Sequence, residues 1–180
     1  MFKSTIILVP GLGNSGEQHW QTYWEKTYHL PRVNQQDWKN PHLPDWLEIL
    51  DQTVTEYNPA DVILVGHSLA CATIGHWAEK YNRNIKAALL VAPADTEAPD
   101  FPPEATNFAP MPLQRLSFPS VIVASTNDEY VTLARAQYFA ECWGSRFINI
   151  GHEGHINASS DLKDWPDGLQ LLQQLDHDLQ

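Results

Sequence analysis

Short apolar runs alternate with amphipathic, helix-like stretches along the whole chain. The strand-like runs cover residues 5–9, 32–36, 62–65, 85–91, 120–124 and 146–150. The helix-like stretches cover residues 15–28, 44–56, 69–81, 131–143 and 168–175. The central runs are apolar throughout, as expected for strands that are buried on both faces. The pattern therefore predicts an α/β fold, a three-layer α/β/α sandwich with a mostly parallel central sheet, in one domain over residues 1–180.

The segment Gly66-His67-Ser68-Leu69-Ala70 lies between a buried run and a helix-like stretch. A serine between small residues in this strand–turn–helix context is typical of a nucleophile elbow, which lifts the hydroxyl above the edge of the sheet. The usual pattern is G-x-S-x-G, and alanine at the last position is still small enough for close packing. We therefore predict that Ser68 is a catalytic nucleophile.

Polar residues follow two later strand-like runs, where ligands of parallel sheets usually bind. Asp128 follows the run 120–124, and His155 follows the run 146–150. A serine nucleophile needs a base, and the base needs a carboxylate that orients it. The order Ser, Asp, His along the chain is that of α/β-hydrolases, so the sequence predicts a triad of Ser68, Asp128 and His155.

Each partner of the serine has an alternative. Asp128 could instead cap the helix that begins near residue 131, and Asp95, after the intervening strand, is a rival acid. His152 competes with His155 for the role of base. We favour His155 because it follows Gly154, which gives the backbone freedom to project the ring into a cleft.

The loop over residues 10–15 is rich in glycine but lacks the spacing of a dinucleotide site and the lysine of a phosphate-binding loop. We interpret it as an oxyanion loop, in which the backbone amides of Leu12 and Leu69 stabilise a tetrahedral intermediate. The other histidines fit no metal-ligand spacing. We therefore expect no metal and no cofactor.

Composition limits the partners. The formal net charge of −11 disfavours nucleic acid and anionic membranes. Two cysteines do not make a disulfide framework, and no apolar run is long enough for a membrane span or a signal sequence. We expect a cytoplasmic protein that acts on a small molecule. Its oligomeric state stays open.

Five motifs carry a resemblance that spans nearly the whole chain. They are Pro10-Gly11-x-Gly13-Asn14-Ser15 with His19-Trp20, Asp37-Trp38 with Pro41 and Trp46, Gly66-His67-Ser68, Ser125-x-Asn127-Asp128-x-Tyr130-Val131, and Gly151-His152-x-Gly154-His155-Ile156-Asn157. With them the chain resembles the small serine hydrolases grouped with retinoblastoma-binding protein nine. The resemblance implies a compact α/β-hydrolase fold with little or no lid and the same triad. The chain has no Leu-x-Cys-x-Glu stretch, so the retinoblastoma-binding role does not carry over.

The sequence therefore predicts a serine hydrolase that cleaves a small ester, thioester or amide through an acyl-enzyme on Ser68. The alternatives are an acyltransferase and a non-catalytic binding protein on the same fold. The segment 93–116 is short for a helical cap, which favours an open, shallow cleft and short acyl chains. We expect Asn14, Trp20 and Trp38 near this cleft.

Overall fold

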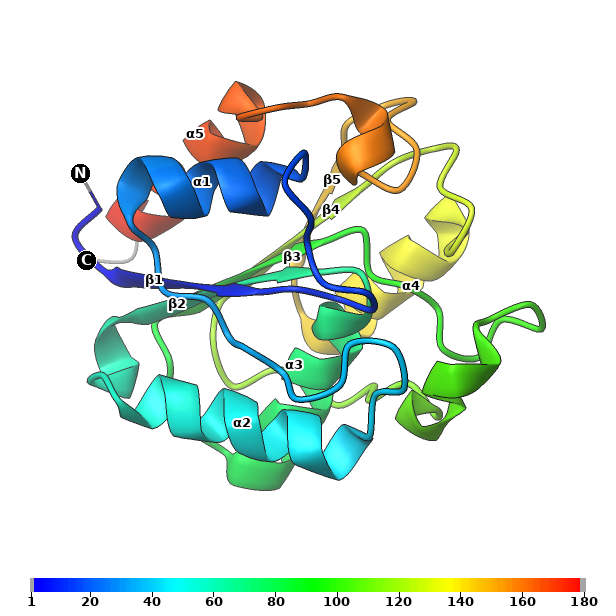
Figure 1. Cartoon of the computed structure of the whole chain (residues 1–180), viewed down its shortest axis with the longest axis horizontal. Coiled ribbons are helices and arrows are strands. Elements are labelled where there is room, and N and C mark those ends of the chain that lie inside the picture. The colour runs from blue at the N-terminus through cyan, green and yellow to red at the C-terminus, as the bar shows by residue number, and fades with distance from the viewer. Residues whose placement is uncertain (1, 179–180) are drawn as a thin grey trace.

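A five-stranded parallel sheet forms the centre of the molecule, in a computed structural model that describes residues 2–178 (Figure 1). Its strands lie side by side in chain order, and every neighbouring pair is parallel. The strands are β1 (Thr5–Val9), β2 (Val62–His67), β3 (Ala87–Val91), β4 (Ser120–Ala124) and β5 (Arg146–Asn149). All five carboxyl ends therefore meet at one edge of the sheet.

Helices cover both faces of the sheet (Figure 1). On one face lie α1 (Trp20–Tyr28) and α5 (Pro166–Asp178). The other face carries α2 (Leu43–Thr55), α3 (Leu69–Tyr81) and α4 (Leu133–Trp143). Alternate residues of β1 enter the two apolar cores, with Ile6 and Leu8 on one side and Ile7 and Val9 on the other. The predicted three-layer α/β/α architecture is confirmed.

The run 32–36 is not the predicted strand. It makes one parallel bridge, between Arg32 and Leu8, and then leaves the sheet. Asn34, Gln35 and Gln36 have low strand propensity, and the side chain of Gln35 turns inward to donate to the carbonyl oxygen of Trp46. The chain thus crosses from the face that carries α1 to the face that carries α2 beside β1. Ligands of parallel sheets bind outside the carboxyl ends of the strands, where the loops after β1 and β2 lie.

Two helices begin later than predicted because polar side chains cap them. His19 accepts a hydrogen bond from the amide of Gln21, so α1 begins at Trp20 rather than at residue 15. Thr132 accepts from the amide of Arg135 and starts α4. The last helix, α5, is longer than predicted at both ends.

The segment 93–116 contains a 3₁₀ turn, η2 (Pro103–Phe108), and no α-helix. Ala105 and Phe108 of this turn pack with Leu69 and Trp46 beside the elbow. The segment therefore forms a wall beside the elbow rather than a helical cap. Two further 3₁₀ turns are η1 (Pro59–Asp61) and η3 (Ala158–Ser160). Over residues 2–178, no helix is both long and apolar enough to cross a membrane.

Candidate active site

Ser68 lies at the sharp turn between β2 and α3. Its backbone has φ 57° and ψ −123°, a conformation that L-residues rarely adopt, and its amide donates to the carbonyl oxygen of Val91. Close packing supports the turn, because a Cβ atom at Gly11 would lie 2.7 Å from the carbonyl oxygen of His67, and one at Gly66 would lie 2.7 Å from Cδ1 of Ile74. The backbone contact makes glycine necessary at position 11, whereas a side chain at position 66 would require Ile74 to shift.

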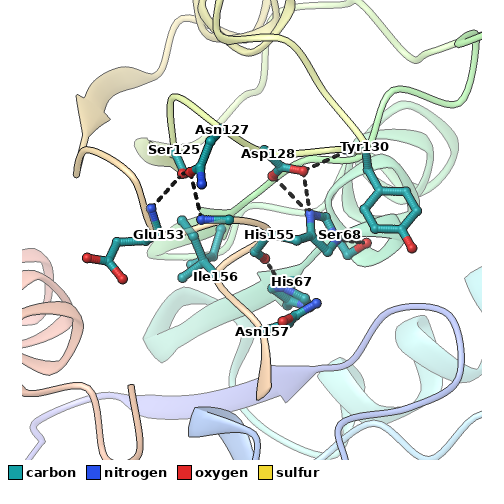
Figure 2. Close-up of polar contacts among 12 residues, drawn as sticks. His67, Ser68, Ser125, Asn127, Asp128, Tyr130, Glu153, His155, Ile156 and Asn157 are labelled. Atoms are coloured by element: carbon teal, nitrogen blue, oxygen red, sulfur yellow. Dashed lines mark hydrogen bonds and ion pairs between the residues drawn. The ribbon is translucent and has the colours of Figure 1, made fainter. Parts of the chain in front are cut away.

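The three residues predicted as a triad lie in hydrogen-bond contact (Figure 2). His155 Nε2 is 2.7 Å from the Ser68 hydroxyl oxygen, and His155 Nδ1 is 2.9 Å from each carboxylate oxygen of Asp128. Because an ionised carboxylate only accepts, Nδ1 carries the proton and Nε2 is free to accept from the serine. The side chains of His155 and Asp128 are 6% and 0% exposed. The arrangement is that of a base oriented by a buried acid.

The contacts match neither alternative, Asp128 as the cap of α4 or Asp95 as the acid, because Thr132 caps α4 and Asp95 binds Arg135. Asp128 does not cap α4, since its carboxylate accepts from the amide of Tyr130, two residues away. Asp95 makes a two-point contact with the guanidinium of Arg135, at 2.7 and 3.0 Å, and accepts from the amide of Glu97. Of the two acids, only Asp128 contacts His155.

Side chains from the loop after β4 hold the loop that carries His155. The hydroxyl of Ser125 accepts from the amide of Glu153, and the amide oxygen of Asn127 accepts from the amide of Gly154 (Figure 2). His152, the rival base, is exposed, and its Nδ1 lies 3.1 Å from the hydroxyl of Thr126. It therefore faces a neighbouring loop, away from Ser68.

Two buried histidines adjoin the base. The ring centroids of His67 and His155 are 5.0 Å apart, and those of His19 and His67 are 4.6 Å apart. Burial, followed by repulsion from Arg32 and His155, lowers the pKa of His19 to about 3. Burial, with repulsion from His19 and His155, lowers the pKa of His67 well below its ordinary value. An imidazolium that forms at His155 therefore has no charged histidine beside it.

A cavity of about 280 Å³ opens over Ser68. Leu12 and Leu69 line it, and within residues 2–178 neither backbone amide donates to a protein acceptor. The amide of Leu69 has no helical partner because Leu69 is the first residue of α3. Gly11 packs closely against the elbow and so brings the loop after β1, which carries Leu12, beside Ser68. Two amides without protein partners thus border the cavity beside the serine hydroxyl.

Of the three residues predicted near the cleft, only Asn14 lines the cavity. Asn14 lines the cavity, and its amide oxygen accepts from Arg32 Nη1 at 2.9 Å. Trp20 is 1% exposed and does not line it, because its indole lies beneath the site and donates to the carbonyl oxygen of Ile156. Trp38 packs against Trp46 outside the cavity. Neither tryptophan is therefore a cleft-lining residue, although Trp20 packs against His67 and Trp38 against the cluster that includes Leu12, and both of these partners line the cavity.

Sequence reasoning missed several residues that shape the site. Tyr130 lines the cavity, and its ring lies 4.5 Å from that of His155, between centroids. Phe101 and Pro102 line the same cavity and come from the segment 93–116. The motif around Asp128 includes Tyr130, but nothing in the sequence indicates that its ring covers the base.

The structure also describes the side chains of metal-binding types and the cysteine that follows the elbow. Among the residues that the structure describes, no group of three or more His, Cys, Asp or Glu side chains could hold a metal ion. Cys71 is buried in α3, and burial raises the pKa of its thiol. A thiol that stays protonated is a poor nucleophile.

Known proteins resemble the chain in sequence and in fold. The family model described as "Serine hydrolase" matches residues 6–174. A YdeN-like hydrolase from Pectobacterium atrosepticum is 32% identical, with a TM-score of 0.86, and the match covers 97% of this chain and 91% of that one. The ydeN gene product of B. subtilis is 16% identical, with a TM-score of 0.77 and coverage of 96% and 98%.

More distant structures share the fold. Est1E from Butyrivibrio proteoclasticus, solved with ferulic acid bound, is 15% identical, with a TM-score of 0.67 over 95% of this chain and 90% of that one. No curated protein matched the chain.

Proposed function

The chain belongs to the serine hydrolase family, and we propose that it cleaves a small ester, thioester or amide through an acyl-enzyme on Ser68. The observation that carries the proposal is the continuous set of hydrogen bonds from the Ser68 hydroxyl through the ring of His155 to the carboxylate of Asp128. Hydrolysis follows from the family, and the hydrogen-bond geometry supports these residue roles.

In the first half of the reaction, Ser68 attacks the substrate carbonyl while His155 Nε2 accepts its proton. Asp128 stabilises the imidazolium, and the amides of Leu12 and Leu69 bind the oxyanion. His155 then returns the proton to the leaving group. In the second half, His155 activates a water molecule, which hydrolyses the acyl-enzyme and regenerates Ser68.

The cavity favours small substrates. Its volume of about 280 Å³ lies just below the usual range for ligand sites, and Phe101 and Pro102 are part of its wall. We expect acyl esters with C2–C4 chains to be cleaved faster than those with C12–C16 chains. A panel of p-nitrophenyl esters below their aggregation limits measures this preference, and faster cleavage of the long esters would contradict it.

Several narrower expectations stay predictions. They are the kinship with the retinoblastoma-binding protein nine group, the cytoplasmic location, the single domain, the independence from metals and cofactors, and the lack of nucleic-acid and membrane partners. Acyl transfer differs from hydrolysis only in the nucleophile that takes the acyl group from Ser68, which is an alcohol or amine instead of water. Product analysis with added alcohols or amines distinguishes the two.

The proposal is tested with a fluorophosphonate probe and an activated ester on wild-type protein and Ser68→Ala. We expect the wild type to be labelled, and the variant to lose labelling and nearly all turnover while it stays folded. Ser117 is exposed, and Ser117→Ala serves as a control that should keep both labelling and turnover. Stoichiometric labelling of Ser68→Ala would show that the nucleophile lies elsewhere.

A further inference from the structure

The side chain of His67 bonds to the backbone of the base. His67 precedes the nucleophile, and its Nε2 lies 2.9 Å from the backbone carbonyl oxygen of His155 (Figure 2). A carbonyl only accepts, so Nε2 must carry the proton and donate it. This hydrogen bond joins the end of β2 to the loop after β5 across 88 positions of the sequence.

The donor is neutral and rigidly held. His67 is 5% exposed, and its ring packs edge-on against those of His19 and Trp20, with centroids 4.6 and 6.0 Å away. Burial lowers the pKa of His67 well below its ordinary value, so the ring stays uncharged through the neutral range. It can therefore donate to His155 without placing a positive charge beside the imidazolium.

Other tethers of the same loop act on neighbouring residues. Side chains after β4 hold the amides of Glu153 and Gly154, and Trp20 holds the carbonyl of Ile156. Among residues 2–178, His67 is the one side chain that bonds to the backbone of His155 itself. The nucleophile and the backbone of the base are thus linked through a single neighbouring residue.

We propose that His67 is a positioning residue, whose hydrogen bond to the His155 carbonyl sets the distance between the base and Ser68. The proposal rests on the proposed function, because a base to be positioned must act on that serine. A displacement of about 1 Å between reacting groups can cost about 100-fold in rate. Loss of this tether should therefore slow chemistry without weakening substrate binding.

The experiment compares His67→Phe, which removes the donor, with His67→Gln, whose amide retains a donor near the position of Nε2. We expect His67→Phe to lower kcat and the rate of fluorophosphonate labelling by about 10- to 100-fold, with KM nearly unchanged. His67→Gln should stay within about threefold of wild type, because its amide retains the donor. Proton NMR adds a direct readout, since the Nδ1–H signal of His155 should broaden in His67→Phe and persist in His67→Gln.

His76 supplies the matched control. Its Nε2 also lies 2.9 Å from a backbone carbonyl oxygen, that of Phe108, and His76 does not line the cavity. His76→Phe removes the same kind of bond, and we expect it to leave the labelling rate unchanged. Urea unfolding of each variant verifies that it is folded, and His67→Met replaces His67→Phe if the latter does not fold.

Two results would overturn the proposal. Either His67→Phe labels as fast as wild type, or His67→Gln is as slow as His67→Phe, in which case the donor is not the cause. Failure of the proposed function would look different, because the wild-type protein itself would then resist the probe.

Discussion

Asp128 and Asp176 lie at opposite ends of the sheet, and their side chains are 0% and 1% exposed. Asp128 follows the carboxyl end of β4, and its side-chain partner is the ring of His155. Asp176 lies in α5 near the amino ends of β1 and β3. There it accepts from the amides of Lys3 and Ser4, from the hydroxyl of Ser4 and from the ammonium of Lys86.

The difference lies in what each carboxylate is connected to. The partner of Asp128 can gain and lose a proton, and it leads to a hydroxyl that opens into a cavity. The partners of Asp176 are fixed donors that join the start of the chain to its last helix. Under the proposed function, equal burial serves catalysis at the carboxyl edge of the sheet and stability at the amino edge, and substitutions can test this division.

The largest expected effect is on turnover at the carboxyl edge. Asp128→Asn should reduce kcat by about 10⁴-fold, because the amide no longer stabilises the imidazolium or selects the tautomer of His155. Steady-state kinetics with an activated ester measures the loss. Asp95→Asn is the control, since that carboxylate binds Arg135, and it should lose far less activity. A reversal of the two effects would place the acid after β3.

At the amino edge, the expected effect is on stability. Asp176→Asn should lower the free energy of unfolding by about 3 kcal/mol, because the buried carboxylate is lost and the partly buried ammonium of Lys86 keeps only neutral acceptors, the Ser4 hydroxyl and the carbonyl of residue 176. Urea unfolding measures this, with the exposed Asp61→Asn as control, and kcat of the folded protein should not change. A loss of kcat comparable with that of Asp128→Asn would break the division between the two edges.

The pH dependence of this stabilisation follows from Asp176. Burial alone would raise its pKa, but hydrogen bonds from Ser4, Lys3 and Lys86 outweigh burial and hold the pKa below the ordinary value of 3.8. The stabilisation is therefore complete above pH 3.8 and fades as the pH falls through the lowered pKa. The difference in stability between wild type and Asp176→Asn should shrink in acid, and a difference that grows in acid would contradict this sign.

The smallest expected effect concerns the aromatic cover of the base. Tyr130→Ala should lower kcat by about two- to fivefold, because the exposed ring stabilises the adjacent imidazolium by about 0.5–1 kcal/mol. Tyr130→Phe keeps the ring and should keep the rate. The contact to Asp128 comes from the backbone of Tyr130, so neither change removes it. Equal losses in both variants would assign the effect to the phenol hydroxyl instead.

Local patterns predicted the elements closest to the site. Helix α3 begins and ends where its pattern does, and β4 matches its apolar run, because the information for both lies within a few neighbouring residues. The run 32–36 was misjudged because its polar half turns inward to meet Trp46, a contact that strand propensity does not contain.

The roles that the sequence did not indicate belong to residues whose hydrogen-bond partners lie far away along the chain. The sequence predicted Trp20 near the cleft, but its indole is buried and donates to the carbonyl oxygen of Ile156, 136 positions later. The bond from His67 to His155 spans 88 positions, and no local pattern distinguishes it from a packed histidine. The order of Ser68, Asp128 and His155 was informative because each follows a parallel strand, and parallel strands end at one edge.

The central claim is that Ser68 attacks with His155 as its base. Peptide mapping of the fluorophosphonate adduct, together with labelling rates for His155→Ala and His152→Ala, tests it most directly. We predict that the adduct lies on Ser68, that His155→Ala loses labelling and turnover, and that His152→Ala keeps a measurable rate of both. An adduct on another residue, or an inactive His152→Ala beside an active His155→Ala, would contradict the account.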